Sequence, residues 1–431
     1  MATPPPRAII VGAGITGLLL AQALKKRSIP FVIYERDPTA DHRGKGWGIT
    51  IHWALDALLS LLPQHIIDRL PEAYVDPEAS RNGDNGNFLF FNLRTGEALW
   101  KVPPNKRIRM AREKFRRLLM EGIDIQWSHT LQDFHHSPNG VTATFTTPSN
   151  PQHSITAPLL IGADGSRSAV RRALFPGSLS ANTPLPVRLL GVSTVYPAAL
   201  SLTARALDPF FYQAGDPATD AFHWFSFLDS PSSNDRQGEA AAGHDCQILV
   251  SWPFRAGFLG DDEKPTEVPV GNVERVRLMK RVARGWAQPF AGIVQAIPEE
   301  AECKSIALED WVPPLAGDRG WEAREGAGRV VLVGDAAHAM TMFRGEAANH
   351  GIVDVQVLVR EVGSLLEGQD ELVFEREREL EEACRRYRRE MVKRTRPAVL
   401  NSRQACLDAH VYERINDESP LIKRRIAVAE E

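Results

Sequence analysis

The feature that most constrains this fold is the run Gly12-Ala13-Gly14-Ile15-Thr16-Gly17, which joins an apolar strand to a helix. Residues 8–11 are apolar and residues 15–27 have helical periodicity. Gly12 permits a tight turn, Gly14 lets the backbone approach a pyrophosphate, and Gly17 lets helix and strand pack closely. The helix N-terminus adds N–H donors and a positive dipole. The run predicts a dinucleotide-binding turn.

A second buried strand, residues 31–34, ends at Glu35, which lies 18 positions after Gly17. An acidic residue at that place can accept hydrogen bonds from a ribose. Strand, turn, helix and acid together favour a dinucleotide site over a ligand-free glycine turn. They do not separate FAD from NAD.

A second motif, Gly162-Ala163-Asp164-Gly165-Ser166, follows the apolar strand 159–161 and precedes a short helix. Taken alone, it is most simply an ordinary turn capped by Asp164 and Ser168. Its position at the end of a buried strand also allows a cofactor contact.

A third motif begins at Gly334-Asp335, after the strand 329–333, and continues through Gly345, Ala347 and Ala348 into a long helix. Asp335 could receive the hydroxyls of a polyol chain. The small residues allow a flat ring to approach backbone N–H groups, and the helix terminus would stabilise negative charge on it. For His338 and His350, satisfied polar structure is favoured over catalysis.

The order of elements predicts an α/β fold. It consists of a Rossmann-like parallel sheet with helices, interrupted by a mostly antiparallel β-sheet domain and followed by C-terminal helices. We expect the dinucleotide-binding domain at 1–75, 106–174 and 326–370, and the second domain at 76–105 and 175–325. Within it, 229–243 is expected to be an exposed loop. Residues 371–431 form the C-terminal segment, with a charged helix ending at Pro397.

Composition narrows the class of protein. The 431 residues carry a net charge of -3, which gives no reason to expect nucleic acid or an anionic membrane as partner. No apolar stretch reaches the roughly 18 residues that span a bilayer. The start, MATPPPRAII, does not resemble a signal peptide, and the four cysteines form neither a metal-ligand spacing nor a disulfide framework. We therefore expect a soluble, cytoplasmic protein, and the sequence leaves its oligomeric state open.

The three motifs, in this order and spacing, resemble the single-component FAD-dependent monooxygenases of the salicylate and p-hydroxybenzoate hydroxylase family. The resemblance runs from the N-terminus to about Asp354. It is closest to fungal secondary-metabolism members, through GWGITIHW, MAREKFRRLL and FRGEAANHGIVD and, near the C-terminus, SRQACLDAH.

The resemblance implies a set of cofactor contacts. Pyrophosphate, ribose, phosphate and flavin would be held by Gly12, Gly14, Gly17, Glu35, Gly48, Arg112, Asp164, Gly334, Asp335, Gly345, Ala347 and Ala348. Arg112 would pair with the phosphates and Asp335 would bind the ribityl chain. Asp164 would serve both FAD and the nicotinamide donor. Two positions depart from the family, Phe343 standing for a proline and Ala347 for a glycine.

In this family NADH or NADPH reduces the flavin, and O2 then forms a C4a-hydroperoxide that oxygenates a small organic substrate. The outcome is hydroxylation or epoxidation of an aromatic or electron-rich molecule, or insertion beside a ketone. Because a phenolate is the better nucleophile, we expect a residue that helps a phenol to ionise. Arg188 and Tyr212 are the candidates, the alternative being a surface arginine and a packed tyrosine. His223 is a weaker candidate for substrate contact.

Two other functions stay open from the sequence. One is a flavin-dependent reductase or dehydrogenase on the same fold, which would consume oxygen without coupling or not at all. The other is a non-catalytic FAD-binding pseudo-enzyme, suggested only by the extra methyl of Ala347.

Overall fold

The computed structural model describes residues 4–42, 46–84, 86–102, 107–137, 140–150, 152–175, 177–229, 243–260, 263–315, 321, 327–367 and 374–423. Residues 230–242, nearly all of the expected exposed loop, lie outside the described residues. The strands are β1 Ala8–Val11, β2 Phe31–Tyr34, β3 Gly48–Ile51, β4 Phe88–Asn92, β5 Ala98–Val102, β6 Ile108–Ala111, β7 Ile125–Gln126, β8 Thr130–Ser137, β9 Gly140–Thr146, β10 His153–Ala157, β11 Leu159–Gly162, β12 Thr183–Pro184, β13 Val187–Tyr196, β14 Phe211–Gly215, β15 Phe222–Asp229, β16 His244–Pro253, β17 Cys303–Ser305, β18 Glu309–Asp310 and β19 Val330–Leu332.

The α-helices, several of them a single turn or two, connect these strands. They are α1 Ile15–Lys26, α2 Leu55–Leu61, α3 Gln64–Ile67, α4 Pro77–Arg81, α5 Arg112–Leu119, α6 Ala169–Leu174, α7 Ala198–Arg205, α8 Asn272–Val282, α9 Phe290–Gln295, α10 Asp335–His338, α11 Ala347–Leu366 and α12 Phe374–Asp408. A 3-10 turn, Met342–Arg344, lies between α10 and α11.

A five-stranded parallel sheet, in the order β19-β11-β1-β2-β7, carries the glycine-rich turn. Its central strand β1 is buried along its whole length, which is why residues 8–11 are uniformly apolar rather than alternating. Helix α1 packs against α11 and α5, and the antiparallel strands β8–β10 lie beside β1 and β11. The sheet brings the carboxyl ends of β1, β11 and β19 to one edge, so the three sequence motifs meet there.

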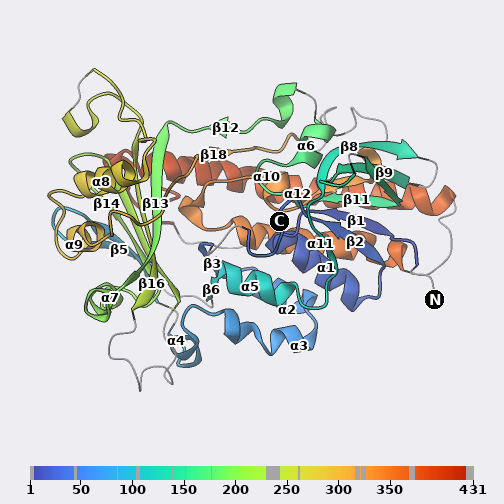
Figure 1. The fold of residues 1–431 in the computed structure, drawn as a ribbon, viewed down its shortest axis with the longest axis horizontal. Coiled ribbons are helices and arrows are strands. Elements are labelled where there is room, and N and C mark those ends of the chain that lie inside the picture. The colour runs from blue at the N-terminus through green and yellow to red at the C-terminus, as the bar shows by residue number, and fades with distance from the viewer. Residues whose placement is uncertain are drawn as a thin grey trace.

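A seven-stranded, mostly antiparallel sheet lies at the other end of the molecule, in the order β17-β13-β16-β15-β14-β4-β5 (Figure 1). Its strands β4 and β5 come from residues 88–102 and join β14 by parallel pairing. One face packs against α8 and α9. The other contributes to an apolar cluster that includes the end of α12. The predicted fold class is confirmed.

Helix α12 differs from the prediction. It was expected to end at Pro397, but it continues through that residue to Asp408 (Figure 1). A proline inside a helix removes one backbone hydrogen bond. Here the turns that follow are held by burial, because Val399, Ala405 and Cys406 are fully enclosed. Tertiary packing outweighs the local preference.

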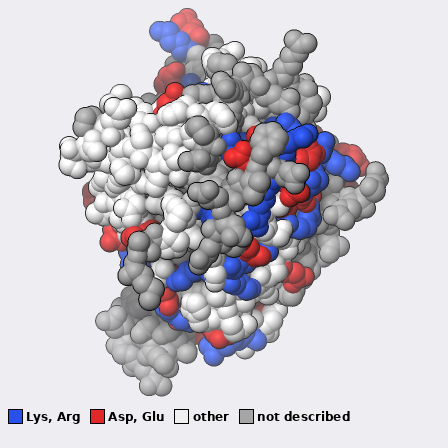
Figure 2. Space-filling view, turned by 90° about the vertical axis from the view of Figure 1, so that its right-hand side faces the viewer, with Lys and Arg blue, Asp and Glu red and all other residues white. Residues whose placement is uncertain are grey.

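Charged residues of both signs lie together on the surface. Figure 2 shows basic and acidic side chains intermingled on one face of the molecule. The charged helix α12 carries ion pairs along its length, such as Arg385 with Glu381, four residues earlier, and Arg385 with Glu382. All four cysteines are buried and free. Among the described residues, no helix combines the length and apolar character needed to cross a membrane.

Candidate active site

Two cavities meet at the carboxyl edge of the parallel sheet. One, of about 410 Å³, follows the glycine-rich turn, and we call it the dinucleotide cavity. The other, of about 360 Å³, opens towards the seven-stranded sheet. We call it the aromatic cavity, because its wall includes Trp47, Phe88, Phe211, Phe222, Trp224 and Phe343. Both are lined by Ile49, Arg112, Ser166, Asp335, Ala347 and Ala348. A single elongated ligand can therefore occupy the two together.

The three glycines of the turn have different roles. Gly12 has a φ of +107°, and a Cβ there would lie 2.5 Å from the carbonyl oxygen of Ala163. A Cβ on Gly17 would lie 2.0 Å from the carbonyl oxygen of Gly12. Around Gly14, by contrast, a Cβ would meet nothing within 4 Å. Gly12 and Gly17 therefore serve packing, and Gly14 leaves the backbone open towards the dinucleotide cavity.

Glu35 lines the dinucleotide cavity and is tied to the turn. Its carboxylate accepts hydrogen bonds from the backbone N–H of Ala13 at 2.7 Å and of Asp37 at 3.0 Å. Arg116, on α5, donates to the carbonyl of Ala13 at 2.9 Å and also lines this cavity. Sequence reasoning missed Arg116, whose only signal was its place on a helix that opens with Arg112.

Asp164 lines the same cavity but is engaged in capping. It accepts hydrogen bonds from Ser168 Oγ at 2.5 Å and from the backbone N–H of Ala169 at 2.5 Å, while Ser168 caps α6 through the N–H of Arg171. Burial raises the pKa of the Asp164 carboxyl, against these hydrogen bonds. The contacts are those of a capped turn, and they leave the carboxylate at the cavity wall.

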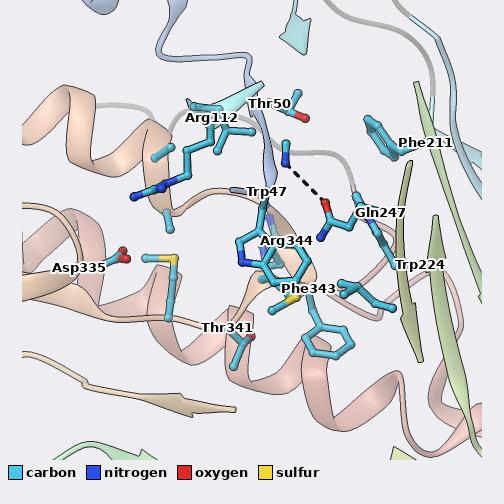
Figure 3. Close-up of a pocket in the computed structure, with 18 of the residues that line it drawn as sticks. Trp47, Thr50, Arg112, Phe211, Trp224, Gln247, Asp335, Thr341, Phe343 and Arg344 are labelled. Carbon is cyan, nitrogen blue, oxygen red and sulfur yellow. Dashed lines mark hydrogen bonds between the residues drawn. The ribbon is translucent and has the colours of Figure 1, made fainter. Parts of the chain in front are cut away.

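Asp335 begins α10, has an exposed side chain and lines both cavities. Desolvation raises the pKa of Asp335, and electrostatic interaction with His338 and Arg112 opposes that shift. Figure 3 places Asp335 and Arg112 on one side of the aromatic cavity, with Phe211, Trp224 and Gln247 on the other. Gly334, before Asp335, has a φ of +60°, and a Cβ there would lie 2.7 Å from Thr16 Oγ1.

The start of α11 forms the wall where the cavities join. Ala347 and Ala348 occupy its first turn, and Gly345 precedes it with a φ of +65°. Asn349, a residue the motifs did not single out, accepts from the N–H of His52 at 3.0 Å and donates to the carbonyl of Thr50 at 2.9 Å. It thereby holds β3 against α11.

A buried guanidinium stands at the aromatic cavity, and sequence reasoning missed it. Arg109, on β6, donates to Thr50 Oγ1 at 2.9 Å and Ser226 Oγ at 3.0 Å, while its Nε is buried without a hydrogen-bond partner. Its Cζ lies 5.3 Å from the ring centre of Phe211 and 5.9 Å from that of Trp224. Burial, with the nearby charge of Arg107, lowers the pKa of Arg109 to about 9.

Gly48 makes room for this arginine. A Cβ on Gly48 would lie 2.4 Å from Arg109 Nη2, and the Gly48 N–H points at Gln247 Oε1, 3.5 Å away (Figure 3). The two short strands β3 and β6 pair directly at this point, Gly48 opposite Ala111. Gly48 thus shapes the aromatic cavity through Arg109 and the strand pair.

The structure places Arg188 and Tyr212 away from both cavities. Arg188 is partly exposed, contacts Glu267 at 3.2 Å and lies over the ring of Phe254. Tyr212 is buried on the face covered by α9, where its hydroxyl lies 3.3 Å from His223 Nε2. Among the described residues that line the cavities, neither is present. The structure therefore gives no support to a substrate contact by either, and the same holds for His223.

His338 and His350 also stay outside the cavity walls. His338 Nε2 lies 2.6 Å from an Asp354 oxygen, and Arg394 donates to His350 Nδ1 at 2.8 Å. Both imidazoles belong to a buried hydrogen-bonded network that joins α10, α11 and α12.

The residues present fit FAD. The open backbone at Gly14 suits a pyrophosphate, and the carboxylate of Asp335 faces the junction where a polyol chain would pass. The small residues Ala347 and Ala348, in the first turn of α11, line the junction where a flat ring would lie. The leading N–H groups of a helix have no partner within that helix and favour negative charge. Since the two cavities share six lining residues, one extended cofactor can reach from Glu35 to the aromatic rings.

Comparison with known proteins agrees with this fit. The family model described as "FAD binding domain" matches residues 65–210 and 317–392, and one described as "NAD(P)-binding Rossmann-like domain" matches 10–40. An Arthroderma benhamiae protein named "Probable FAD-dependent monooxygenase" is 53% identical over 98% of this chain and 96% of its own. The FAD-dependent monooxygenase tazP of Aspergillus terreus is 40% identical over 81% of this chain and 87% of its own.

Solved structures share the fold at low identity. The 2,6-dihydroxypyridine-3-hydroxylase of Arthrobacter nicotinovorans superposes with a TM-score of 0.71 at 15% identity, over 100% of this chain and 99% of its own. HpxO of Klebsiella pneumoniae, solved with FAD and uric acid, gives 0.67 at 20% identity, over 94% and 89%. With its motifs, its cavities and these relatives, the chain belongs to the FAD-dependent monooxygenases related to those of fungal secondary metabolism.

Proposed function

We propose that this monooxygenase oxygenates a flat aromatic compound that binds in the aromatic cavity as an anion, with an ionised phenol or enol oxygen on Arg109. The observation that carries the proposal is the buried guanidinium itself. Among the described residues no carboxylate lies within ion-pair distance of Arg109, and its Nε has no partner.

A buried charge without a counterion costs several kcal/mol, on the order of 3 or more. Two neutral hydroxyls and the attraction of the more distant Asp208 offset only part of that cost for Arg109, and Arg107 beside it adds repulsion. A substrate anion would remove the penalty. The rings of Phe211 and Trp224, which stack at 5.0 Å, offer such a substrate a flat apolar surface beside the charge.

In this arrangement Arg109 would lower the pKa of a bound phenol and turn its ring into a better nucleophile. Thr50 and Ser226 would hold the guanidinium in place, and the aromatic wall would exclude water. FAD, once reduced by NADH or NADPH, would activate O2, which is the source of the transferred oxygen atom. Two structural neighbours are linked by name to acidic ring compounds: one is a hydroxylase of 2,6-dihydroxypyridine, and the other, HpxO, was solved with uric acid.

The cofactor contacts form the second part of the proposal. Gly14 and Arg112 would meet the pyrophosphate, Glu35 the adenosine ribose, and Asp335 the ribityl chain. The remaining contacts would shape the turns around the cofactor or touch the flavin, and they are Gly12, Gly17, Gly48, Asp164, Gly334, Gly345, Ala347 and Ala348. Their support is that all of them except Gly17 and Gly334 line one of the two cavities.

The test compares 1,3-dihydroxynaphthalene with 1,3-dimethoxynaphthalene, which cannot ionise, on FAD-saturated protein. Wild type should bind the dihydroxy compound more tightly and lower its pKa, read from the phenolate absorption band. Arg109→Met should weaken that binding by about 10- to 100-fold, the worth of a charge-assisted hydrogen bond, and leave the dimethoxy compound unaffected.

The matched control is Arg277→Met. It removes an exposed guanidinium on α8 that pairs with Glu299. It should change neither affinity. Equal binding of the dihydroxy compound by wild type and Arg109→Met, with no shift of the phenol pKa in wild type, would overturn the anion proposal.

We also infer a cytoplasmic location. The four free, buried thiols support it, because secreted domains tend to pair their cysteines. Fractionation of the producing cells with an antibody to the protein tests this, and recovery in the medium would contradict it.

A further inference from the structure

A buried carboxylate on α11 holds both ends of the one-turn helix α10. Asp354 is fully buried, and one of its oxygens accepts from the backbone N–H of Gly334 at 2.7 Å and lies 2.6 Å from His338 Nε2. Gly334 is the residue before α10 and His338 is its last residue. Asp335, whose carboxylate faces the junction of the two cavities, lies between them.

The other oxygen of Asp354 is held from α12. Arg394 donates to it at 2.5 Å and, through its second nitrogen, to His350 Nδ1 at 2.8 Å. Arg394 is thus a bridge from α12 to two residues that lie one turn apart on α11. It lies two residues beyond the part of the chain that the FAD-binding family model matches, which ends at 392.

The charge of Arg394 is what this carboxylate requires. Asp354 accepts hydrogen bonds from the Gly334 N–H and from Arg394, which favour its ionised form. Its burial opposes ionisation unless a cation lies close. Arg394 and His338 are the two groups in contact with Asp354 that can supply positive charge. Together they lower the pKa of Asp354 to about 2 in spite of its burial.

We propose that Arg394 is a positioning residue for FAD: acting through Asp354, it holds α10 and therefore places Asp335 for the cofactor. The C-terminal helix, on this account, is part of the cofactor site although none of its residues lines the dinucleotide cavity among those described. Without Arg394, Asp354 keeps its contacts with Gly334 and His338 but loses the guanidinium that favours its charge, so its hold on the two ends of α10 weakens.

The fold has independent support at this point. Tyr387, also on α12, donates to the carbonyl of Leu332 on β19 at 2.7 Å, and α11 and α12 pack along each other through apolar residues. Loss of Arg394 should therefore weaken FAD binding more than it weakens the fold. A purely structural role would do the opposite.

The experiment titrates FAD into the apoprotein by quenching of flavin fluorescence, beside thermal unfolding of the apoprotein. Arg394→Met should raise the Kd for FAD at least tenfold and alter the visible circular dichroism of bound flavin. Arg394→Lys should recover part of the affinity, because an ammonium can still pair with Asp354. The control is Arg386→Met, on the same helix, where an exposed guanidinium pairs with Glu361; it should change neither quantity.

A double-mutant cycle tests the route through Asp354. If Arg394 acts through that carboxylate, Arg394→Met should cost little further FAD affinity in an Asp354→Asn background. If the Arg394→Met apoprotein does not fold, Arg394→Lys and Asp354→Asn carry the test by the same two measurements. Wild-type Kd and flavin dichroism in Arg394→Met, or full additivity with Asp354→Asn, would overturn the proposal. None of these results depends on which substrate the enzyme takes.

Discussion

Gly14 and Gly17 lie three residues apart in one turn, yet the structure predicts opposite consequences for the same substitution. A Cβ on Gly17 would lie 2.0 Å from the carbonyl oxygen of Gly12, 1.4 Å short of the 3.4 Å at which ordinary contacts begin. The obstacle is backbone, and Ala163 Cβ at 3.2 Å closes the other side. A Cβ on Gly14 would meet nothing within 4 Å.

These distances set the magnitudes. Overpacking a closely packed site costs about 1–3 kcal/mol, and because backbone cannot move aside here we expect the upper end, about 3 kcal/mol, for Gly17→Ala. Gly14→Ala should change the free energy of unfolding of the apoprotein by less than about 1 kcal/mol. Its methyl would instead occupy space that the pyrophosphate needs, so FAD affinity should fall at least about tenfold, or 1.4 kcal/mol.

The assay measures urea unfolding of each apoprotein and the Kd for FAD separately. We expect Gly17→Ala to be destabilised before any cofactor is added, and Gly14→Ala to be stable and to bind FAD poorly. Wild-type FAD affinity in Gly14→Ala would refute the assignment of this turn to the pyrophosphate. Equal loss of stability in both variants would refute the packing argument.

Further predictions follow from buried polar groups. The folded-state pKa of Asp354, about 2, lies below the 3.8 that is ordinary for an aspartate side chain. Its ionised form therefore stabilises the fold above about pH 4, by about 2 kcal/mol, and this contribution is lost as the pH falls towards 2. The difference in urea stability between wild type and Asp354→Asn should shrink from pH 7 to pH 3, and a constant difference would contradict the linkage. Arg188→Ala should leave binding of dihydroxynaphthalene within about twofold, since the side chain lies outside the cavity, and a tenfold loss by fluorescence titration would restore it as a substrate contact. Tyr212→Phe should cost about 1 kcal/mol in urea unfolding, through its lost hydrogen bond to His223, with aromatic binding unchanged.

The sequence predicted the parts of the site that local chemistry determines. A glycine turn between strand and helix, with Glu35 at the end of the next strand, is typical of a dinucleotide site. Asp335 also follows a buried strand. Parallel strands bring such turns to one edge, so the dinucleotide cavity could be placed before the structure was known. The family resemblance, which rests on these motifs, and the fold class, which rests on the order of elements, are confirmed.

The sequence could not predict the groups that depend on pairing between distant segments. Arg109 lies in the short strand β6, and its environment comes from Thr50 and Ser226, which are 59 and 117 residues away. Arg394 meets Asp354 across 40 residues of chain. Neither position carries a local pattern. Strand alternation could have suggested that Tyr212 and Phe211 face opposite sides of a sheet, but not which side holds the cavity.

The helix beyond Pro397 is a case where packing reverses a local rule. Burial of Val399, Ala405 and Cys406 against the rest of the fold keeps α12 helical past the proline. The local sequence shows the proline, but the contacts that stabilise the helix come from distant segments and cannot be read from it.

The most direct test of the account is the fate of labelled dioxygen. The FAD-loaded protein is given NADPH or NADH, an aromatic phenol that accelerates oxidation of the nicotinamide, and ¹⁸O₂, and the products are analysed by mass spectrometry. The account predicts one ¹⁸O atom in the aromatic product, and loss of that product in Arg109→Met. Accelerated oxidation of the nicotinamide with all of the label in hydrogen peroxide would contradict monooxygenation and support a reductase. Failure of the protein to bind FAD at all would contradict the cofactor site itself.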